Sequence, residues 1–218
     1  MKVELHSHTG ESSLCGRLTA KELIELHKDA DYDGIVITDH FNKENLNVFQ
    51  GDPLEQVKQW LNGYEMAKRT GDRVGLRVFF GLEARNLVNE NDYLIYGATP
   101  KLVLNYPLLY TYSLQQISEI CHKEKCLLVQ AHPYRLGCMP ADVKFLDGVE
   151  VYNCNPRHNS QNEKAKELAD KNPQLIQIAG SDVHRKEDLA GTSVVIERNV
   201  ESEIQLYEAL SRKEFHIS

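Results

Sequence analysis

Short apolar runs alternate with amphipathic segments along most of this 218-residue chain, with no internal repeat, low-complexity tract or linker. That alternation predicts an α/β fold with mostly parallel strands. Strands are expected at residues 3–5, 34–38, 76–82, 92–96, 126–130, 148–152, 175–179 and 192–196. No helix is expected between the third and fourth strands. Strands this short and numerous favour a small, irregular barrel, with an open doubly wound sheet as the alternative.

Several helices carry a start signal of their own. Thr19 and Glu22 have the spacing of a capping box. Asp52 precedes Pro53, which suits the first turn of a helix. Ser113 opens a segment that carries apolar residues on one face. Two further helices are expected at residues 159–172 and 200–213.

The composition is that of a globular protein. Hydrophobic residues make up 41% and charged residues 26%, which excludes disordered, collagenous and coiled-coil chains. A net charge of −7 disfavours non-specific binding to nucleic acid. No apolar run reaches the roughly 18–20 residues that span a bilayer, and the start of the chain does not have the pattern of a signal peptide. Five scattered cysteines do not form a disulfide framework. We expect one domain over residues 1–218, located in the cytoplasm.

Most side chains that can bind a metal follow directly after an expected strand. They are His6, His8, Asp39, His40, Glu83, His132, Asn153, Asp182 and His184. The carboxyl ends of parallel barrel strands meet at one rim, where active sites form. These residues, although far apart in sequence, are therefore expected to share one pocket.

Two pairs among them have the spacing of metal ligands. His6 and His8 are two residues apart on an extended segment, so both imidazoles point to the same side. Asp182 and His184 repeat this spacing. Imidazole and carboxylate together suit zinc, manganese or iron. A carboxylate such as Glu83 can bridge two ions, as in two-metal hydrolases.

Other interpretations apply to single residues of these types. Asp39 and Asp182 could cap helices or form turns. His27, His122 and His216 lie in or near charged helical segments and are interpreted as solvent-exposed. The prediction of a metal site therefore depends on the combination of motifs at strand ends.

Five short motifs occur in order: His6-Ser7-His8-Thr9, Thr38-Asp39-His40, Gly81-Leu82-Glu83, Ala131-His132-Pro133 and Ser181-Asp182-Val183-His184. In this order they resemble the motifs of the PHP superfamily (polymerase and histidinol phosphatase domains). The resemblance extends from residue 1 to about residue 190. It implies a distorted, TIM-like (β/α)7 barrel with up to three divalent ions at the C-terminal rim of the strands. It also implies hydrolysis of phosphate esters, as a phosphomonoesterase or an exonuclease.

The same resemblance assigns ligands to three ions: His6, His8, Glu83 and Asp182 to the first, Glu83 and His132 to the second, and His40 and His184 to the third. On this pattern the candidate catalytic residues are Asp182, Glu83 and His184. The nucleophile implied is a metal-bound hydroxide.

Two positions depart from the family pattern. Cys15 stands where the family commonly has an aspartate or a histidine, and its thiolate is a possible metal ligand or a small structural thiol. Leu94 stands where many members have a further histidine before a glycine. Support for the second ion is therefore in question.

A phosphoesterase needs cations for the phosphate oxygens that do not react, and arginine suits this purpose. Arg135 is the first candidate, with Arg157 second and Arg85 third. Asn153 is a candidate hydrogen-bond donor to the substrate. Each could instead be a structural partner on the surface or in a turn.

The leading hypothesis is a small-molecule phosphomonoesterase that requires zinc, manganese or iron and acts on a small phosphorylated substrate. The alternatives are an amidohydrolase-like enzyme that cleaves C–N bonds and a metal-binding regulatory module without turnover. Nucleic acid and membranes are not expected as partners.

Overall fold

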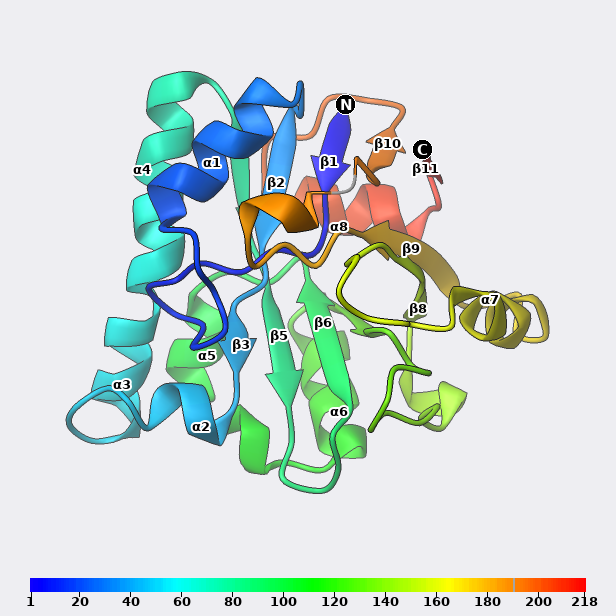
Figure 1. The fold of residues 1–218 in the computed structure, drawn as a ribbon. Coiled ribbons are helices and arrows are strands. Elements are labelled where there is room, and N and C mark those ends of the chain that lie inside the picture. Colours follow the sequence, from blue (N-terminus) through cyan, green and yellow to red (C-terminus); the bar gives the residue numbers. More distant parts are fainter. Residues whose placement is uncertain (190) are drawn as a thin grey trace.

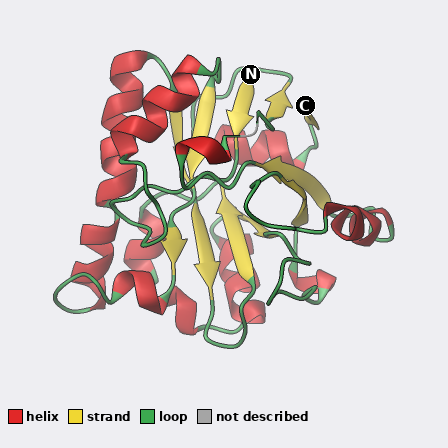
Figure 2. Cartoon of the chain, viewed as in Figure 1, coloured by secondary structure: helices red, strands yellow, loops and turns green. Residues whose placement is uncertain are grey.

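The computed structural model describes residues 1–189 and 191–218, and its strands form two sheets beside a set of helices (Figures 1 and 2). The first sheet has the order β11 (Phe215–Ile217), β10 (Val194–Ile196), β1 (Lys2–Glu4), β2 (Gly34–Ile37) and β4 (Arg77–Phe80). The second has the order β3 (His40–Phe41), β5 (Leu82–Arg85), β6 (Asp92–Tyr96), β7 (Leu127–Gln130), β8 (Gly148–Asn153) and β9 (Ile176–Gly180). The fold is thus mixed α/β, as expected.

The helices are α1 (Ala20–Asp29), α2 (Lys43–Leu46), α3 (Pro53–Trp60), α4 (Asn62–Val74), α5 (Lys101–Asn105), α6 (Leu114–Lys123), α7 (Asn162–Asp170) and α8 (Glu203–Ser211). Short 3-10 helices occur at η1 (Leu109–Thr111), η2 (Val143–Phe145) and η3 (Lys186–Asp188). The three expected start signals are confirmed. Thr19 and Ser113 each form a capping box, and the Asp52 side chain accepts the backbone N–H groups of Leu54 and Glu55. The sequence analysis did not identify α2, α4 and α5.

Strand β6 runs antiparallel to both of its neighbours, β5 and β7. In the described chain no helix lies between β5 and β6, as expected. A parallel connection needs about a dozen or more residues, so the short loop at 86–91 instead reverses the chain. Asp92, the first residue of β6, therefore pairs with Arg85, the last residue of β5. This start of β6 lies at the rim where the neighbouring strands end.

The strand expected at residues 76–82 is divided into β4 and β5, with Gly81 between them. A Cβ atom at Gly81 would lie 2.8 Å from the side chain of Val36 and 3.1 Å from the carbonyl of Ile95, so only glycine fits there. Because the strand resumes after Gly81, Glu83 lies inside β5 rather than after a strand. Its register partner in β3 is His40.

The two sheets are linked where β1 and β9 end. A bridge pairs Ser7 with Val183, and the N–H of His8 donates to the carbonyl of Val183 at 2.9 Å. The N–H of Thr38 donates to the carbonyl of Ser7 at 2.9 Å. Strand pairing in the described residues does not show the closed ring of seven strands that the family resemblance implies.

Helices α1 and α4 lie side by side over β2 and β4 (Figure 1). Their apolar residues, Leu23 and Ile24 among them, bury a cluster with Ile35 and Val78. His27 on α1 is also fully buried, so the interpretation of it as solvent-exposed is wrong. Its Nδ1 lies 2.8 Å from the carbonyl of Leu23, and burial lowers the pKa of His27 to about 4.

None of the helices in residues 1–189 and 191–218 is long and apolar enough to cross a membrane.

Candidate metal centre

All seven predicted ligands lie together. His6 and His8 follow β1, His132 follows β7, and Asp182 and His184 follow β9. His40 begins β3 and Glu83 lies in β5. The side chain of His40 is 14% exposed, and the other six residues expose 8% or less. Such a concentration of buried polar groups needs an internal partner.

Glu83 lies between four histidines. Its Oε1 is 3.2 Å from Nε2 of His6 and 3.2 Å from Nε2 of His132. Its Oε2 is 2.8 Å from Nδ1 of His40 and 3.4 Å from Nε2 of His8. Both carboxylate oxygens, and the facing nitrogens of His6, His8 and His40, nevertheless have no hydrogen-bond partner. Buried polar atoms that converge in this way are stabilised by a cation between them, so the residues fit divalent metal ions.

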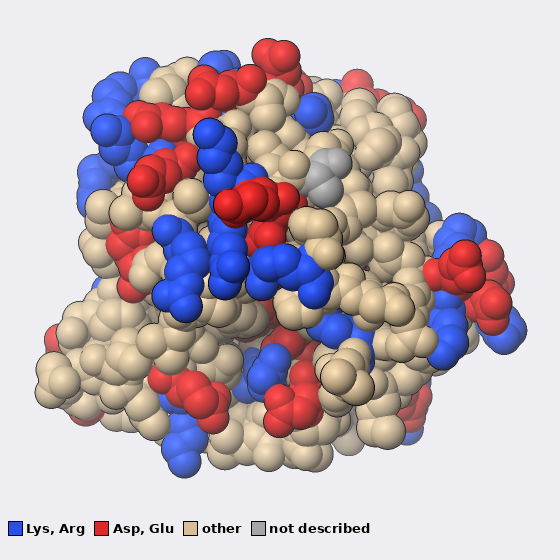
Figure 3. Space-filling model, in the orientation of Figure 1, with Lys and Arg blue, Asp and Glu red and all other residues tan. Residues whose placement is uncertain are grey.

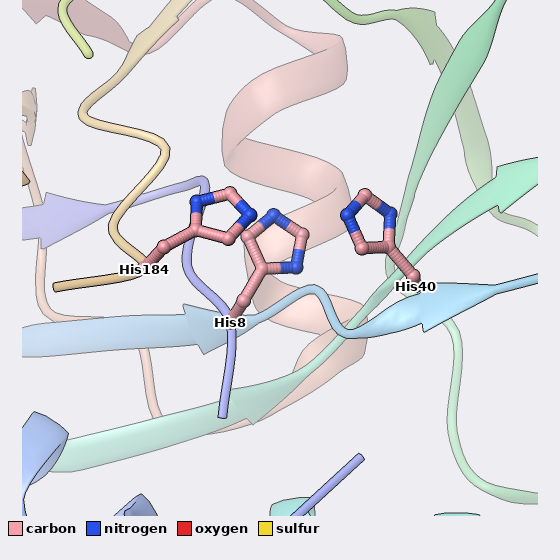
Figure 4. A group of neighbouring side chains, drawn as sticks. All are labelled: His8, His40 and His184. Carbon is pink, nitrogen blue, oxygen red and sulfur yellow. The ribbon is translucent and has the colours of Figure 1, made fainter. Parts of the chain in front are cut away.

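Asp182 forms the opposite side of the centre. Its Oδ1 lies 3.4 Å from Nε2 of His6, 3.3 Å from Nε2 of His8 and 3.4 Å from Nδ1 of His184. The rings of His8, His40 and His184 come from three separate segments and converge (Figure 4). His8 stacks on the other two, with ring centroids 4.4 Å from His40 and 4.3 Å from His184.

Four groups of three residues hold ligand atoms within 4.8 Å of one another: His6, His8 and Asp182; His6, Glu83 and His132; His8, His40 and His184; and His40, Glu83 and Asp92. The first three groups contain all seven residues that the sequence singled out. The family model for the PHP domain matches residues 4–199, which include all of these side chains. This chain belongs to the PHP domain family.

Relatives of the PHP domain differ widely in size and activity. DNA polymerase III PolC-type from Streptococcus thermophilus is 31% identical over 97 residues, which cover 44% of this chain and 5% of the polymerase. A two-domain protein from Bacteroides vulgatus, described as containing a PHP-like metal-dependent phosphoesterase, superimposes with a TM-score of 0.70 at 15% identity. That match covers 100% of this chain and 64% of the other chain. The lesion-specific endonuclease from Pyrococcus furiosus gives a TM-score of 0.64 at 12% identity, over 99% of this chain and 57% of its own.

Asp92 is the ligand candidate that the sequence analysis missed. It is 2% exposed, and its Oδ2 lies 3.9 Å from Nε2 of His132. Leu94, where a histidine is common in the family, is instead buried in an apolar cluster. Asp92 also pairs with Arg85, which donates to its two oxygens at 2.8 and 2.7 Å. The sequence signal that could have identified Asp92 was the absence of a helix between the third and fourth expected strands. Without a helix the second strand of the pair runs in reverse, so its first residue lies at the rim.

The carboxylates of the PHP domain are held ionised. Burial opposes ionisation of Glu83, but the nearby charges of His40 and His6 hold its pKa well below the ordinary value. Burial likewise opposes ionisation of Asp182, and His6 together with a hydrogen bond from His8 holds the pKa of this carboxyl well below its ordinary value. Both carboxylates are therefore anionic at neutral pH, as a metal ligand must be.

The histidines divide into two classes. Burial would lower the pKa of His132, but its contacts with Cys138 and Glu83 outweigh burial and raise it to about 9. Carboxylates around His6 likewise outweigh burial and raise its pKa well above the ordinary value. His8 is buried beside the like charges of His184 and His40, so its pKa falls well below the ordinary value. Without ions, protons neutralise part of the carboxylate charge.

Cys15 lies at the edge of the centre and is exposed. Burial of its thiol would raise the pKa, but hydrogen bonds to His184 and His40 outweigh burial and lower it to about 6. The segment before it is fixed by Asp39. Oδ1 of Asp39 accepts from the backbone N–H of Thr9 at 2.6 Å and from Oγ of Ser13 at 2.7 Å, and its Oδ2 accepts from the hydroxyl of Thr9 at 2.7 Å. Asp39 is therefore a support of this loop and does not belong to any of the four ligand groups in the described residues.

A cavity of about 300 Å³ opens above the centre. Its lining includes Cys15, His40, Glu83, Asp92, His132, Arg135, Arg157, Asp182 and His184. On the corresponding face of Figure 3, acidic side chains lie at the bottom of a hollow with basic side chains around it. The cavity is at the small end of the range for ligand pockets.

The three candidate arginines all line the cavity, and all have carboxylate partners. Arg135 donates to Oδ2 of Asp182 at 2.7 Å, and its Nε has no partner. Arg157 donates to Asp188 at 2.8 and 2.9 Å. Asn153 is 3% exposed and does not line the cavity; its Oδ1 accepts from Arg135 at 2.8 Å.

Proposed function

We propose that this PHP domain is a phosphomonoesterase that requires divalent metal ions and acts on a small phosphorylated substrate. The observation that carries the proposal is the position of Glu83. Both oxygens of this buried carboxylate lie among four histidine nitrogens and have no hydrogen-bond partner. A carboxylate in this position can bridge two ions, as in two-metal hydrolases of phosphate esters.

The ligand groups define what each residue contributes. His6, His8 and Asp182 would hold a first ion, and His132 with Glu83 a second; His40 and His184 would hold a third. Asp92 places a second carboxylate near His132 and would support the second ion in place of the histidine that Leu94 replaces. Bound divalent ions supply Lewis acidity and lower the pKa of a coordinated water. Asp182, Glu83 and His184 are the proposed catalytic residues. Glu83 belongs to two of the groups, and Oδ1 of Asp182 lies 3.4 Å from Nδ1 of His184, so this pair joins the first group to the third.

The cavity supports a small phosphorylated substrate. Its lining has three arginines, Arg85, Arg135 and Arg157, and four carboxylates, Glu83, Glu90, Asp92 and Asp182. These groups alone leave one excess negative charge, and two divalent ions would reverse it to three positive charges. Arg135 has a buried Nε without a partner, which would reach a phosphate oxygen only if the side chain turned toward the cavity, whereas Arg157 must share its guanidinium with Asp188.

The proposal extends to the fold. The Ser7–Val183 bridge joins the ends of β1 and β9, and the backbone of Glu83 donates to the carbonyl of Asp39 at 3.1 Å across the division between the sheets. These links support a distorted TIM-like barrel whose rim carries the metal centre.

Phosphate release tests this function. The protein, loaded separately with zinc, manganese or iron, is expected to release phosphate from sugar phosphates, nucleoside monophosphates and p-nitrophenyl phosphate. Asp182→Ala is the control that lacks a carboxylate of the first ligand group, and metal content is measured in every sample.

Each other outcome contradicts the proposal in its own way. Faster cleavage of single-stranded or duplex oligonucleotides would make the domain a nuclease, as the Pyrococcus furiosus relative is. Hydrolysis of cyclic amides alone would indicate an amidohydrolase. Stoichiometric metal without any turnover would indicate a regulatory module.

We also propose that Cys15 is a thiolate ligand beside His40 and His184. Cobalt-loaded protein is then expected to show a thiolate-to-metal charge-transfer band in the near ultraviolet, and Cys15→Ser is expected to lose it. Cys138→Ser is the matched control because Cys138 lines the same cavity. Its sulfur lies 3.8 Å from Nδ1 of His132, whereas the nitrogen of His132 that faces Glu83 is Nε2. A band that survives in Cys15→Ser excludes the thiolate ligand.

A further inference from the structure

Glu150 is a buried carboxylate behind the metal centre that the sequence analysis did not identify. It lies in β8 and is 0% exposed. None of the four ligand groups in the described residues contains it, and it does not line the cavity. A charge buried this completely is retained only where its partners need it.

Its partners are three hydrogen-bond donors. Oε1 lies 2.9 Å from Nδ1 of His6, and a carboxylate can only accept, so Nδ1 carries the hydrogen. Oε2 accepts from the backbone N–H of His132 at 3.0 Å and from Nδ2 of Asn153 at 3.0 Å. With a hydrogen held on Nδ1, the nitrogen of His6 left to bind a metal ion is Nε2, which faces Glu83 and Asp182.

The second contact stabilises a strained backbone. His132 has a φ of 28° and Asp182 a φ of 54°, in the left-handed region that residues other than glycine rarely adopt. The N–H of His132 is fixed by Glu150, and the carbonyl of Asp182 accepts from Nδ2 of Asn155 at 2.7 Å. Nδ2 of Asn153 also reaches Oδ2 of Asp182 at 3.3 Å.

The fold places Glu150 at this position by two local devices. The register of β8 and β9 shifts between Glu150 and Tyr152, and such a bulge redirects a side chain. Opposite it, Gly180 leaves room for the carboxylate, because a Cβ there would lie 3.2 Å from Oε1 of Glu150 and 2.6 Å from Cβ of His6.

We infer that Glu150 is the positioning residue of the metal centre, which fixes the tautomer of His6 and the backbone of His132 and steadies Asp182 through Asn153. The inference rests on the metal-dependent function proposed above. Carboxylates that accept the second N–H of a histidine ligand set its orientation and raise its basicity, and their loss weakens metal binding by about 10- to 100-fold.

The nature of the three partners makes an amide a poor substitute. In Glu150→Gln, one end of the side chain becomes an NH₂ group, and each end now faces a donor. Placed at Oε1, the NH₂ forces the hydrogen of His6 onto Nε2, where it blocks the metal. Placed at Oε2, it opposes both the His132 N–H and Asn153. The isosteric change therefore disturbs the centre in either orientation.

Zinc affinity and the tautomer of His6 test the inference. In the zinc-loaded wild-type protein, ¹⁵N NMR of the imidazoles is expected to show His6 with a hydrogen on Nδ1 and the metal on Nε2. Glu150→Gln is expected to bind zinc about 10- to 100-fold more weakly at the sites of His6 and His132. Glu150→Asp, which keeps the carboxylate, is expected to recover part of this affinity.

The control is Asp147→Asn, the same type of change at the residue directly before β8. Asp147 accepts from the N–H of Leu128 at 2.8 Å and belongs to none of the four ligand groups in the described residues. Its substitution is expected to leave zinc affinity unchanged. The inference is overturned if Glu150→Gln binds zinc as tightly as the wild-type protein does. It is also overturned if His6 of the wild-type protein binds zinc through Nδ1. The second result needs no variant, so it decides the question even if Glu150→Gln folds poorly. A wild-type protein that binds no metal would instead remove the proposed function.

Discussion

Glu83→Gln is expected to lower metal-dependent phosphate release by about 1,000-fold or more, which corresponds to about 4 kcal/mol of lost transition-state stabilisation. The two oxygens of Glu83 face four histidine nitrogens within 3.4 Å, so under the proposed assignment the substitution removes a ligand from two ions at once. An amide also carries an NH₂ group, which faces nitrogen atoms that should bind metal. Steady-state rates and bound metal per chain are the measurements.

The matched control for this prediction is Glu119→Gln. Glu119 is exposed on α6, and the described structure gives it only a hydrogen bond from Gln115 at 2.9 Å. It is expected to keep wild-type rates and metal content. Near-wild-type turnover in Glu83→Gln, with its fold confirmed by circular dichroism, would show that the bridging carboxylate is not part of the reaction.

Removing the ions is expected to destabilise the protein strongly. An ion present at about 1,000 times its dissociation constant stabilises the folded state by about 4 kcal/mol. For a chain of this size, 1 kcal/mol shifts the melting temperature by about 2–4 °C, so a chelator is expected to lower Tm by about 8–16 °C per tightly bound ion. Differential scanning calorimetry before and after EDTA, and after zinc is restored, measures the effect.

The size of this shift is expected to depend on pH in a known direction. In the metal-free protein the pKa values of His6, His40 and His184 are raised, and that of His132 is raised to about 9. The stability that these protonated histidines contribute is present below their unfolded pKa and is lost as pH rises through the folded pKa. Metal binding displaces the same protons.

The loss of Tm on chelation is therefore expected to be small at pH 6 and largest near pH 9. A shift that is equal at both values, or larger at pH 6, would contradict the assignment of these histidines as ligands. Calorimetry in paired buffers at the two pH values decides between these outcomes.

That most side chains of the candidate metal centre lie together could be predicted because these residues have a pattern along the chain. His6 with His8 and Asp182 with His184 have ligand spacing, and strand ends gather at one rim. Asp92 could not be found by the same rule because it begins a strand. Only the reversed direction of β6 brings it beside His132.

Residues that act from behind the centre give a weaker signal. Glu150 is surrounded by valines in a buried strand and reads as an isolated polar residue. Its role follows from contacts with His6, 144 positions away, and with His132. The pairing of Arg157 with Asp188 likewise spans 31 positions and depends on how two loops pack. Such partners are set by tertiary structure, which periodicity and spacing do not specify.

The bridge between Ser7 and Val183 has a consequence for biogenesis. His6 and His8 are synthesised more than 170 residues before Asp182, which completes their ligand group. Until Asp182 has been synthesised, His6 and His8 lack the carboxylate of their ligand group. On the proposed ligand assignment, tight binding of the first ion therefore requires that both segments have been made and have paired.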